Sequence, residues 1–371
     1  MKEFRLIGCI TVICLFGIFA SAALSKTIKI GEAEVLYTED ELPIWYDCSL
    51  STIQKDADTM YFFHSFGCRF EPEEKRRSRH SWHSGPARDP FKVHEMSKTE
   101  EAFWDYNGFY KDTDQEGIWI LAMYKRENGD LLGITHSEID FATKKLEFHF
   151  SIGLAYSTDE GRSWEYCGEI IRPADDRTNI GGGAYVIAGE YLYVYFNDTD
   201  MPDDAGAFNS EAAERQGRRQ CVARARLDEV LEKAAKHEVG QWFKYKDGKW
   251  DVPGLSKAAG EDLIPNVYGA EDLHSDAAYC TELGKYLLTV QTHGAHKLVL
   301  FSSADGIKWE QEAIVDETEE NVMQPYSSFV DYDGPAADCH EVDGSFYIYY
   351  PHKQLAGPEN DYMYRRLVTI E

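Results

Sequence analysis

Short runs of alternating apolar and polar residues, bounded by Gly, Asp and Asn, recur along most of the chain. A period of two is typical of β-strands with one buried face, and the bounding residues are those that form turns. The runs fall into five successive groups, which begin near Ile44, Trp104, Ile180, His274 and Ser327. The pattern therefore predicts an all-β fold, a five-bladed β-propeller of four-stranded antiparallel sheets.

Each group contains at least one clear strand pattern. The plainest runs are Thr59–Ser65, Gly117–Arg126, Leu131–Glu138, Leu146–Ser157, Tyr191–Asn197, Tyr286–Thr292, Leu298–Ser303, Ser327–Tyr332, Ser345–Tyr350 and Met363–Ile370, with a closing hairpin over Val239–Val252. We expect Thr27–Tyr37 to be a strand that helps to close the ring. Its use in a sixth blade is the alternative.

Two segments interrupt this pattern. Arg69–Ala102 is charged, rich in His and without periodicity, so we interpret it as a long loop; long loops are usually functional or disordered. Leu227–His237 places four apolar residues on one face at helical spacing, which predicts a short helical insertion at the surface.

A turn motif is repeated inside the strand-rich sequence. Ser157–Trp164 reads S-x-D-x-G-x-x-W, Ser303–Trp309 is a shorter relative, and Asp247–Trp250 is a more degenerate form. In such a turn the Asp accepts backbone N–H groups, Gly takes a positive φ, and Trp covers an apolar flank. Asp-Gly turns followed by Trp also occur in unrelated all-β proteins. Three copies nevertheless favour a repeated blade, in which these hairpins are scaffold and carry no chemistry.

The N-terminus has the layout of a secretory signal peptide. Lys2 and Arg5 precede the apolar run Leu6–Phe19, and small residues follow at Ala20–Ala22. We therefore expect a signal peptide over residues 1–22, a single β-propeller domain over 23–371, and a secreted or periplasmic location. No later stretch is long enough to span a bilayer.

The chain carries a formal net charge of −27. This acidity argues against nucleic acid and anionic membranes as partners, because phosphate binding needs concentrated Lys and Arg. The basic cluster Lys75–Arg79 follows three glutamates, so we interpret it as a solvated loop. Aromatic residues make up 13% of the chain, and exposed aromatic rings suit sugars, although core packing would use them equally well.

Six cysteines follow the predicted signal peptide, an even number that permits disulfides in an exported protein. Cys48 and Cys68, which flank one predicted hairpin, are the first candidate pair. Buried free thiols are the alternative.

Several segments together resemble a known enzyme family. Ile44–Ser49 around Asp47, the two longer Asp turns, and Asp338–Tyr350 (D-C-H-E-V-D-G-S-F-Y-I-Y-Y) are similar to five-bladed β-propeller glycoside hydrolases related to family 43, and the turns resemble sialidase Asp boxes. The resemblance implies three acidic residues on inner strands: an Asp base on the first blade, an Asp that tunes a pKa, and a Glu acid on a later blade. Here Cys48 follows Asp47, where the family has Pro.

Glycoside hydrolysis needs two carboxyl groups at the scissile bond, one protonated and one ionised. Asp47, at the first strand of its group, is the predicted general base. Glu138 shares a strand face with His136 and is the predicted general acid. Asp276 opens the fourth group, where it would act as base or raise the pKa of the acid. The structural alternatives are a turn cap for Asp47, a surface salt bridge for Glu138 and a strand cap for Asp276.

Other residues are candidates for binding substrate or lining the channel: Trp104, Asp105, His136, His274, His293 and His340. Three glycines, Gly181–Gly183, lie at the start of a predicted inner strand, where they let backbones crowd the axis. Carboxyl chemistry requires no cofactor. Ca²⁺ would suit an acidic channel, but no ligand spacing specifies a metal site.

The leading hypothesis is an exported glycoside hydrolase that acts on a polysaccharide or oligosaccharide by inversion. A sialidase-like hydrolase would need an arginine cluster, for which the candidates are Arg172, Arg177, Arg224 and Arg226. A polysaccharide lyase would use His or Tyr as its base. A non-catalytic carbohydrate-binding propeller would lack an acidic pair at the channel.

Overall fold

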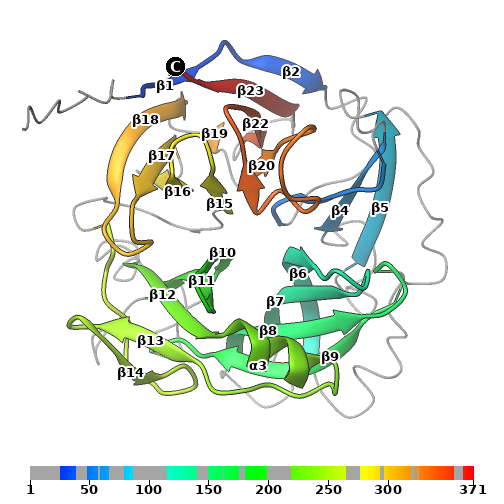
Figure 1. The fold of residues 1–371 in the computed structure, drawn as a ribbon, viewed down its shortest axis with the longest axis vertical. Coiled ribbons are helices and arrows are strands. Elements are labelled where there is room, and N and C mark those ends of the chain that lie inside the picture. The colour runs from blue at the N-terminus through cyan, green and yellow to red at the C-terminus, as the bar shows by residue number, and fades with distance from the viewer. Residues whose placement is uncertain are drawn as a thin grey trace, which may run out of the picture.

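The computed structural model describes residues 26–38, 48–56, 59–66, 79–86, 115–139, 149–161, 163–174, 180–198, 219–264, 276–292, 296–318, 322–323, 326–354 and 362–371. Within these ranges the strands form five sheets. The sheets stand around a common axis, each with one strand near the axis and the others stepping outward (Figure 1). The protein is therefore a β-propeller, as the alternating pattern predicts.

The first four blades follow one another along the chain. Blade 1 contains β3 (Ser51–Gln54), β4 (Thr59–Phe66) and β5 (Arg79–Pro86). Blade 2 contains β6 (Gln115–Lys125), β7 (Leu131–Ile139), β8 (His149–Ser157) and β9 (Glu165–Ile171). Blade 3 contains β10 (Gly182–Ala188), β11 (Tyr191–Asp198), β12 (Arg219–Arg226), β13 (Phe243–Lys246) and β14 (Lys249–Pro253). Blade 4 contains β15 (Asp276–Cys280), β16 (Lys285–Thr292), β17 (Lys297–Ser303) and β18 (Glu310–Glu317).

Blade 5 joins the two ends of the chain. It contains β19 (Val322–Met323), β20 (Ser328–Val330), β22 (Ser345–Gln354) and β23 (Tyr362–Ile370), with β1 (Ile28–Ile30) and β2 (Glu34–Tyr37) paired antiparallel to β23. The N-terminal strands thus complete the last sheet and close the ring, as expected for Thr27–Tyr37.

The sheets hold three to six of the described strands, whereas the sequence predicts four in each. The N-terminal strands enlarge blade 5, and the β13–β14 hairpin gives blade 3 a fifth strand. A two-residue strand, β21 (Glu341–Val342), leaves blade 5 and pairs in parallel with β15 of blade 4. This exchange brings a segment of blade 5 to the axis.

Apolar side chains between neighbouring blades form the core. Ile152 of blade 2 and Phe196 of blade 3, both fully buried, belong to one such cluster. Nearer the axis, Gly183 has φ +113°, and a Cβ there would lie 2.6 Å from Cδ1 of Leu121 in β6. Only glycine lets β10 approach the Leu121 side chain so closely, which confirms the prediction at Gly183.

The repeated turns connect outer strands. In the turn between β8 and β9, Asp159 Oδ1 accepts the N–H of Ser163 at 2.8 Å. In the turn between β17 and β18, Asp305 Oδ1 accepts the N–H of Lys308 at 2.8 Å. Asp247, at φ +50°, connects β13 to β14. The predicted hairpins are therefore present, and each lies between outer strands of its blade.

The predicted helical insertion is α3 (Leu227–Ala234), between β12 and β13. Its buried residues, Val230 and Ala234, join the core cluster between blades 2 and 3. The helix ends before the predicted His237, which instead takes φ +58°. Within the described ranges, no helix has the length and apolar character needed to cross a membrane.

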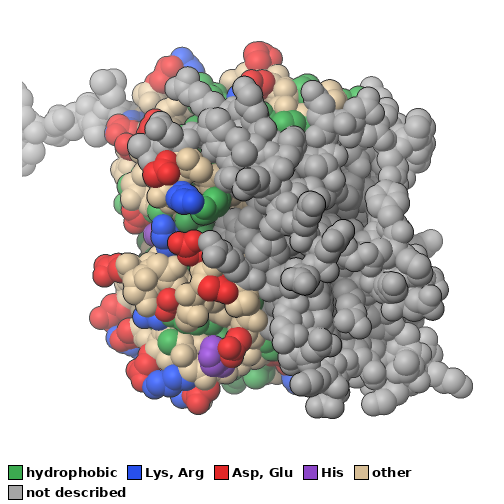
Figure 2. All heavy atoms as spheres, turned by 90° about the vertical axis from the view of Figure 1, so that its right-hand side faces the viewer, with side chains coloured by type: hydrophobic (Ala, Val, Ile, Leu, Met, Phe, Trp, Pro, Cys, Tyr) green, Lys and Arg blue, Asp and Glu red, His purple; other side chains and the backbone are tan. Residues whose placement is uncertain are grey.

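Charged side chains of both signs are interspersed over the described part of the face in Figure 2. Exposed ion pairs include Arg226 with Asp228 at 2.9 Å and Lys236 with Glu232 at 2.7 Å. Pairs of this kind contribute about 0–1 kcal/mol each. The fold is therefore stabilised chiefly by burial between blades.

Candidate functional site

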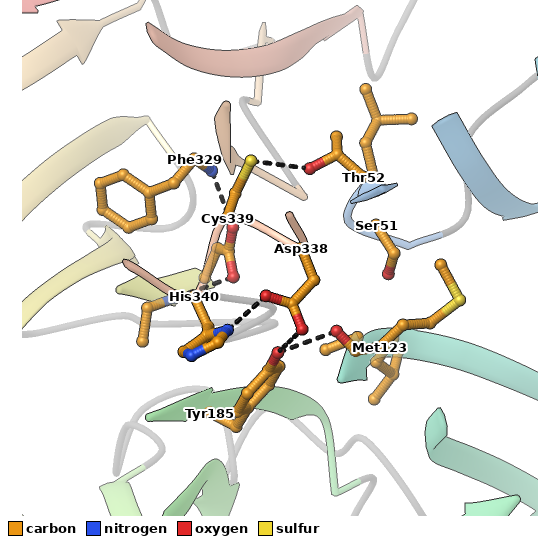
Figure 3. Close-up of a pocket in the computed structure, with 13 residues that line it drawn as sticks. Ser51, Thr52, Met123, Tyr185, Phe329, Asp338, Cys339 and His340 are labelled. Carbon is orange, nitrogen blue, oxygen red and sulfur yellow. Dashed lines mark hydrogen bonds and ion pairs between the residues drawn. The ribbon is translucent and has the colours of Figure 1, made fainter. Parts of the chain in front are cut away.

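A pocket lies at the axis, where inner strands of blades 1 to 4 meet a segment of blade 5 (Figure 3). Its cavity volume is about 20 Å³, room for about one water molecule, and the cavity is partly open to solvent. The residues that line it are Leu50, Ser51, Thr52, Leu121, Ala122, Met123, Tyr185, Asp276, Ala277, Phe329, Asp338, Cys339 and His340. About half of these residues are polar, and a concave site on which polar groups converge is a usual place for a small ligand.

The segment 331–344, between β20 and β22, carries the pocket's polar groups from blade 5; we call it the axial loop. Its attachments reach the inner strands on either side. The N–H of Tyr279 in β15 donates to the carbonyl oxygen of His340 at 2.8 Å, and the N–H of Gln54 in β3 donates to that of Ala337 at 2.6 Å. The loop is thus tied to both blade 4 and blade 1.

Asp338 connects the axial loop to two more blades. Its Oδ2 accepts the backbone N–H of Lys125, at the end of β6, at 2.7 Å. The hydroxyl of Tyr185, in β10, lies 3.3 Å from the same oxygen and 2.8 Å from the carbonyl oxygen of Met123, and shares its proton between them. Oδ1 pairs with Nδ1 of His340. Because both oxygens are engaged and the side chain is 2% exposed, Asp338 is suited to hold other groups in place.

His340 presents a more accessible group to the pocket, since 16% of its side chain is exposed. Its ring packs beside those of Tyr124, at 5.7 Å between centroids, and Tyr185, at 6.0 Å. Burial lowers the pKa of His340, but the hydrogen bond and the charge of Asp338 outweigh it, so the pKa lies above its ordinary value. The expectation that His340 lines the channel is confirmed.

Cys339 stands between these two residues in a left-handed conformation, with φ +57°. For a residue other than glycine this conformation costs about 1–2 kcal/mol. Its thiol is held at both sides: the Thr52 hydroxyl donates to Sγ at 3.1 Å, and the Asp331 N–H donates to it at 3.4 Å. Burial raises the pKa of Cys339 to about 12, so the thiol is not a nucleophile at neutral pH. Its role is to hold the backbone that carries Asp338 and His340.

Asp276 is the second carboxyl of the pocket and the first residue of β15. Its Oδ2 accepts the N–H of Phe329 at 2.7 Å, and its Oδ1 accepts the N–H of Ala277 at 2.9 Å. Burial raises the pKa of Asp276 to about 7, against the opposing effect of these two donors. The carboxyl therefore keeps its proton close to neutral pH, as a general acid must.

The structure thus places one of the three predicted catalytic carboxyls, Asp276, in the pocket, and the N–H of Ala277 shows that it also caps its strand. Asp47 lies outside the described residues. Glu138 belongs to β7, the second strand of blade 2, and only its backbone is described.

Of the predicted substrate-binding residues, Trp104, Asp105, His274 and His293 lie outside the described residues, as does Cys68 of the candidate disulfide. His136 is 3% exposed, and its ring is 6.0 Å from the rings of Trp119 and Phe150. It packs inside blade 2, one strand away from the axis, and is not among the residues that line the pocket. Strand alternation placed it on a face but could not show that this face is enclosed.

Two residues of the pocket, Tyr185 and Asp338, were not predicted as site residues from the sequence. Asp338 and His340 stand two apart in a stretch rich in Asp and Gly between two strands, which was the available signal. Tyr185 gave none, because a Tyr in an alternating strand is ordinary.

Of the four arginine candidates for a sialidase-like site, the three that the structure describes do not line the pocket. In the described part of the chain, their contacts are Arg172 with Glu169 at 2.6 Å, Arg224 over the Trp250 ring at 4.2 Å, and Arg226 with Asp228 at 2.9 Å, while Arg177 lies outside it. No three His, Cys, Asp or Glu side chains of the described residues are placed to hold a metal ion, and a Ca²⁺ site stays a prediction.

Comparisons with known proteins give structural likenesses only. No protein-family model matches the chain, and no curated protein is recognisably similar in sequence. Similar solved structures include CoXyl43, a family-43 β-xylosidase/α-arabinofuranosidase from a compost microbial metagenome crystallised with xylotriose in a calcium-free form, at 13% identity over 93% of this chain and 94% of that one, with a TM-score of 0.49.

Two others are a thermostable family-43 glycoside hydrolase and Zg3597, a family-117 glycoside hydrolase of Zobellia galactanivorans. The first is 11% identical over 90% of this chain and 92% of its own, with a TM-score of 0.48. The second is 9% identical over 93% of this chain and 90% of its own, with a TM-score of 0.47. These likenesses concern the arrangement of the sheets and identify no reacting residue.

Proposed function

We propose that the protein is an exported glycoside hydrolase that cleaves a polysaccharide or oligosaccharide at the axial pocket. The observation that carries the proposal is Asp276, a pocket carboxyl whose pKa burial raises to about 7. Glycoside hydrolysis requires one carboxyl that is still protonated when the substrate binds, so that the leaving oxygen can receive a proton. The resemblance in sequence to family-43 enzymes supports the same chemistry.

In this proposal Asp276 is the general acid, a role the sequence assigned to Glu138. A raised pKa suits an acid better than a base, since a base must be ionised when water attacks. Asp47 remains the carboxylate base that the sequence predicts. With an acid and a base rather than a nucleophile, the reaction inverts the anomeric configuration, and NMR of the first product formed would test this.

The experiment is a screen of the purified full chain against plant, algal and microbial polysaccharides and their oligosaccharides, read as new reducing ends. We expect Asp276→Asn to abolish hydrolysis while the variant still melts cooperatively. Asp251→Asn, at an exposed position of β14, is the matched control and should hydrolyse at the wild-type rate. Asp47→Asn and Glu138→Gln test the other two predicted carboxyls.

Three results would contradict the proposal. Full activity in Asp276→Asn and Asp47→Asn alike would remove both carboxyls that it relies on. Unsaturated products would identify a lyase. Binding of a polysaccharide with no new reducing ends on any substrate would identify a carbohydrate-binding propeller.

A further inference from the structure

The axial pocket holds an imidazole whose position is fixed at both backbone and ring. The carbonyl oxygen of His340 accepts the N–H of Tyr279, and its ring packs beside those of Tyr124 and Tyr185, which also contact each other. Nδ1 hydrogen bonds to Oδ1 of Asp338. A side chain held in this way has little freedom to leave the pocket, so the orientation of its free nitrogen is set in advance.

The partner of Nδ1 determines which nitrogen can react. A carboxylate oxygen is an acceptor, so Nδ1 carries the proton and Nε2 is the basic nitrogen. No described residue hydrogen bonds to Nε2. The Asp338 carboxylate lies on the Nδ1 side of the ring. Its side chain is 2% exposed, whereas that of His340 is 16% exposed. A buried carboxylate that orients an accessible imidazole is the arrangement by which His serves as a general base, because the carboxylate stabilises the imidazolium that forms.

We propose that His340 is a catalytic residue of this pocket and takes the proton of the attacking water, with Asp338 and Cys339 as positioning residues. This rests on the proposed function and replaces Asp47 as its base. It pairs an imidazole base with a carboxyl acid, in place of two carboxyls.

Water oxygen bonds to the anomeric carbon as one water O–H bond breaks, and Nε2 takes that proton. The bond from the anomeric carbon to the leaving oxygen breaks, the electron pair stays on that oxygen, and Asp276 gives it a proton. His340 ends as imidazolium and Asp276 as carboxylate. Return of one proton from His340 to Asp276 through solvent restores both, and one water is consumed per bond cleaved.

Asp338 itself is not the base, because its two oxygens are already engaged by Lys125, Tyr185 and His340. Cys339 acts through the conformation of its backbone. Its left-handed backbone lets two residues on either side of it share a hydrogen bond, and the contacts of its thiol with Thr52 and Asp331 keep it so. Strain held by surrounding contacts is frequent at functional sites.

The test uses the full chain and a substrate that the wild-type protein hydrolyses. We expect His340→Ala to lower kcat about 10²–10⁴-fold with little change in KM, the range for loss of a general base. Imidazole added to the buffer should restore part of the activity of this variant and none of that of Asp276→Asn. His340→Gln provides a second variant if the alanine variant does not fold. His237→Ala, at an exposed turn after α3, is the matched control and should change nothing.

Asp338→Asn has a signature that a structural defect alone would not produce. The titratable groups acting on His340 are Asp338, Glu341, Tyr124 and Tyr185. Since Asp338 raises the pKa of His340, its removal should move the acidic limb of kcat/KM to lower pH as well as lowering kcat. In His340→Ala the acidic limb of the kcat/KM profile should no longer reflect titration of the imidazole, because the imidazole has been removed.

The outcomes separate the two proposals. If the wild-type protein hydrolyses substrate and folded His340→Ala keeps its kcat, the role of His340 is wrong and the proposed function stands. Loss of activity in Asp47→Asn, with His340→Ala fully active, would return the base to Asp47. A wild-type protein that hydrolyses nothing would overturn the proposed function, and the role of His340 with it.

Discussion

Asp276 should make the protein less stable as pH rises towards neutrality. The pKa of its carboxyl is about 7 in the folded protein, against 3.8 for an unperturbed aspartate. Between these values the folded state holds a proton that the unfolded state has lost, so the free energy of unfolding falls with pH by up to about 1.36 kcal/mol per unit. The stabilisation by the protonated carboxyl is present in full below pH 3.8 and is lost as pH rises through about 7.

Over this window the total loss is about 4 kcal/mol. It is an upper limit, because Asp276 retains some contact with the solvent of the pocket. For 371 residues, an unfolding entropy of about 2.1 cal/mol/K per residue converts it into a change in Tm of about 5 °C. Other groups titrate in the same range, so the comparison with a variant isolates the contribution of Asp276.

The assay is thermal unfolding of the wild type, Asp276→Asn and Asp251→Asn from pH 4.5 to pH 8, a range of roughly the titration window. The amide leaves an N–H donor facing another donor, which costs about 1–3 kcal/mol at every pH. The wild type should therefore be the more stable at low pH, and its advantage over Asp276→Asn should shrink or reverse at high pH. Asp251→Asn should follow the wild type throughout. A gap between wild type and Asp276→Asn that does not change with pH would refute the protonated carboxyl, and with it the general acid.

Two further substitutions test the packing of the blades by urea denaturation. Gly183→Ala should lower the free energy of unfolding by about 2–5 kcal/mol, because backbone strain and overpacking act together. The control Gly248→Ala, at φ +76° in open space, should lower it by about 1–2 kcal/mol from strain alone. Equal losses in the two variants would show that the close approach of β10 and β6 is unimportant. Lys244→Met should cost about 3–5 kcal/mol, because it leaves Asp198, 3.6 Å away and 0% exposed, as a buried charge without this cation. Lys236→Met, in an exposed pair, should cost no more than about 0.5 kcal/mol, and a similar value for Lys244→Met would contradict the reasoning.

The fold was predictable because its determinants are local in sequence. Alternation over Tyr191–Asn197 and Leu298–Ser303 gave strands that match β11 and β17 almost to the residue. The turn residues gave the outer hairpins, and helical spacing gave α3. The additional strands of blades 3 and 5 were harder to place, since the edge partner of a strand is not encoded in its own alternation.

The site was predictable at two residues. Asp276 was found because it starts an inner strand, and His340 was a candidate for lining the channel. Asp338 meets Lys125 and Tyr185 across 213 and 153 residues of chain, in a loop whose β21 leaves its own blade to pair with β15. No periodicity or spacing in the sequence records such an exchange, so the residues that it assembles could not be identified as a group.

The axial loop also explains why Asp338 and His340 should respond differently to substitution. The carboxylate of Asp338 receives a backbone N–H from blade 2 and faces a hydroxyl from blade 3, so it joins blades as well as orienting the imidazole. Removing it disturbs the packing at the axis and the chemistry together. The ring of His340 makes no hydrogen bond to another blade among the described residues, and the attachment of this residue to β15 is through its backbone, which any side chain preserves. Substitution at His340 should therefore test the proposed catalysis apart from folding, whereas Asp338→Asn should change both and is interpreted through the shift of its pH profile.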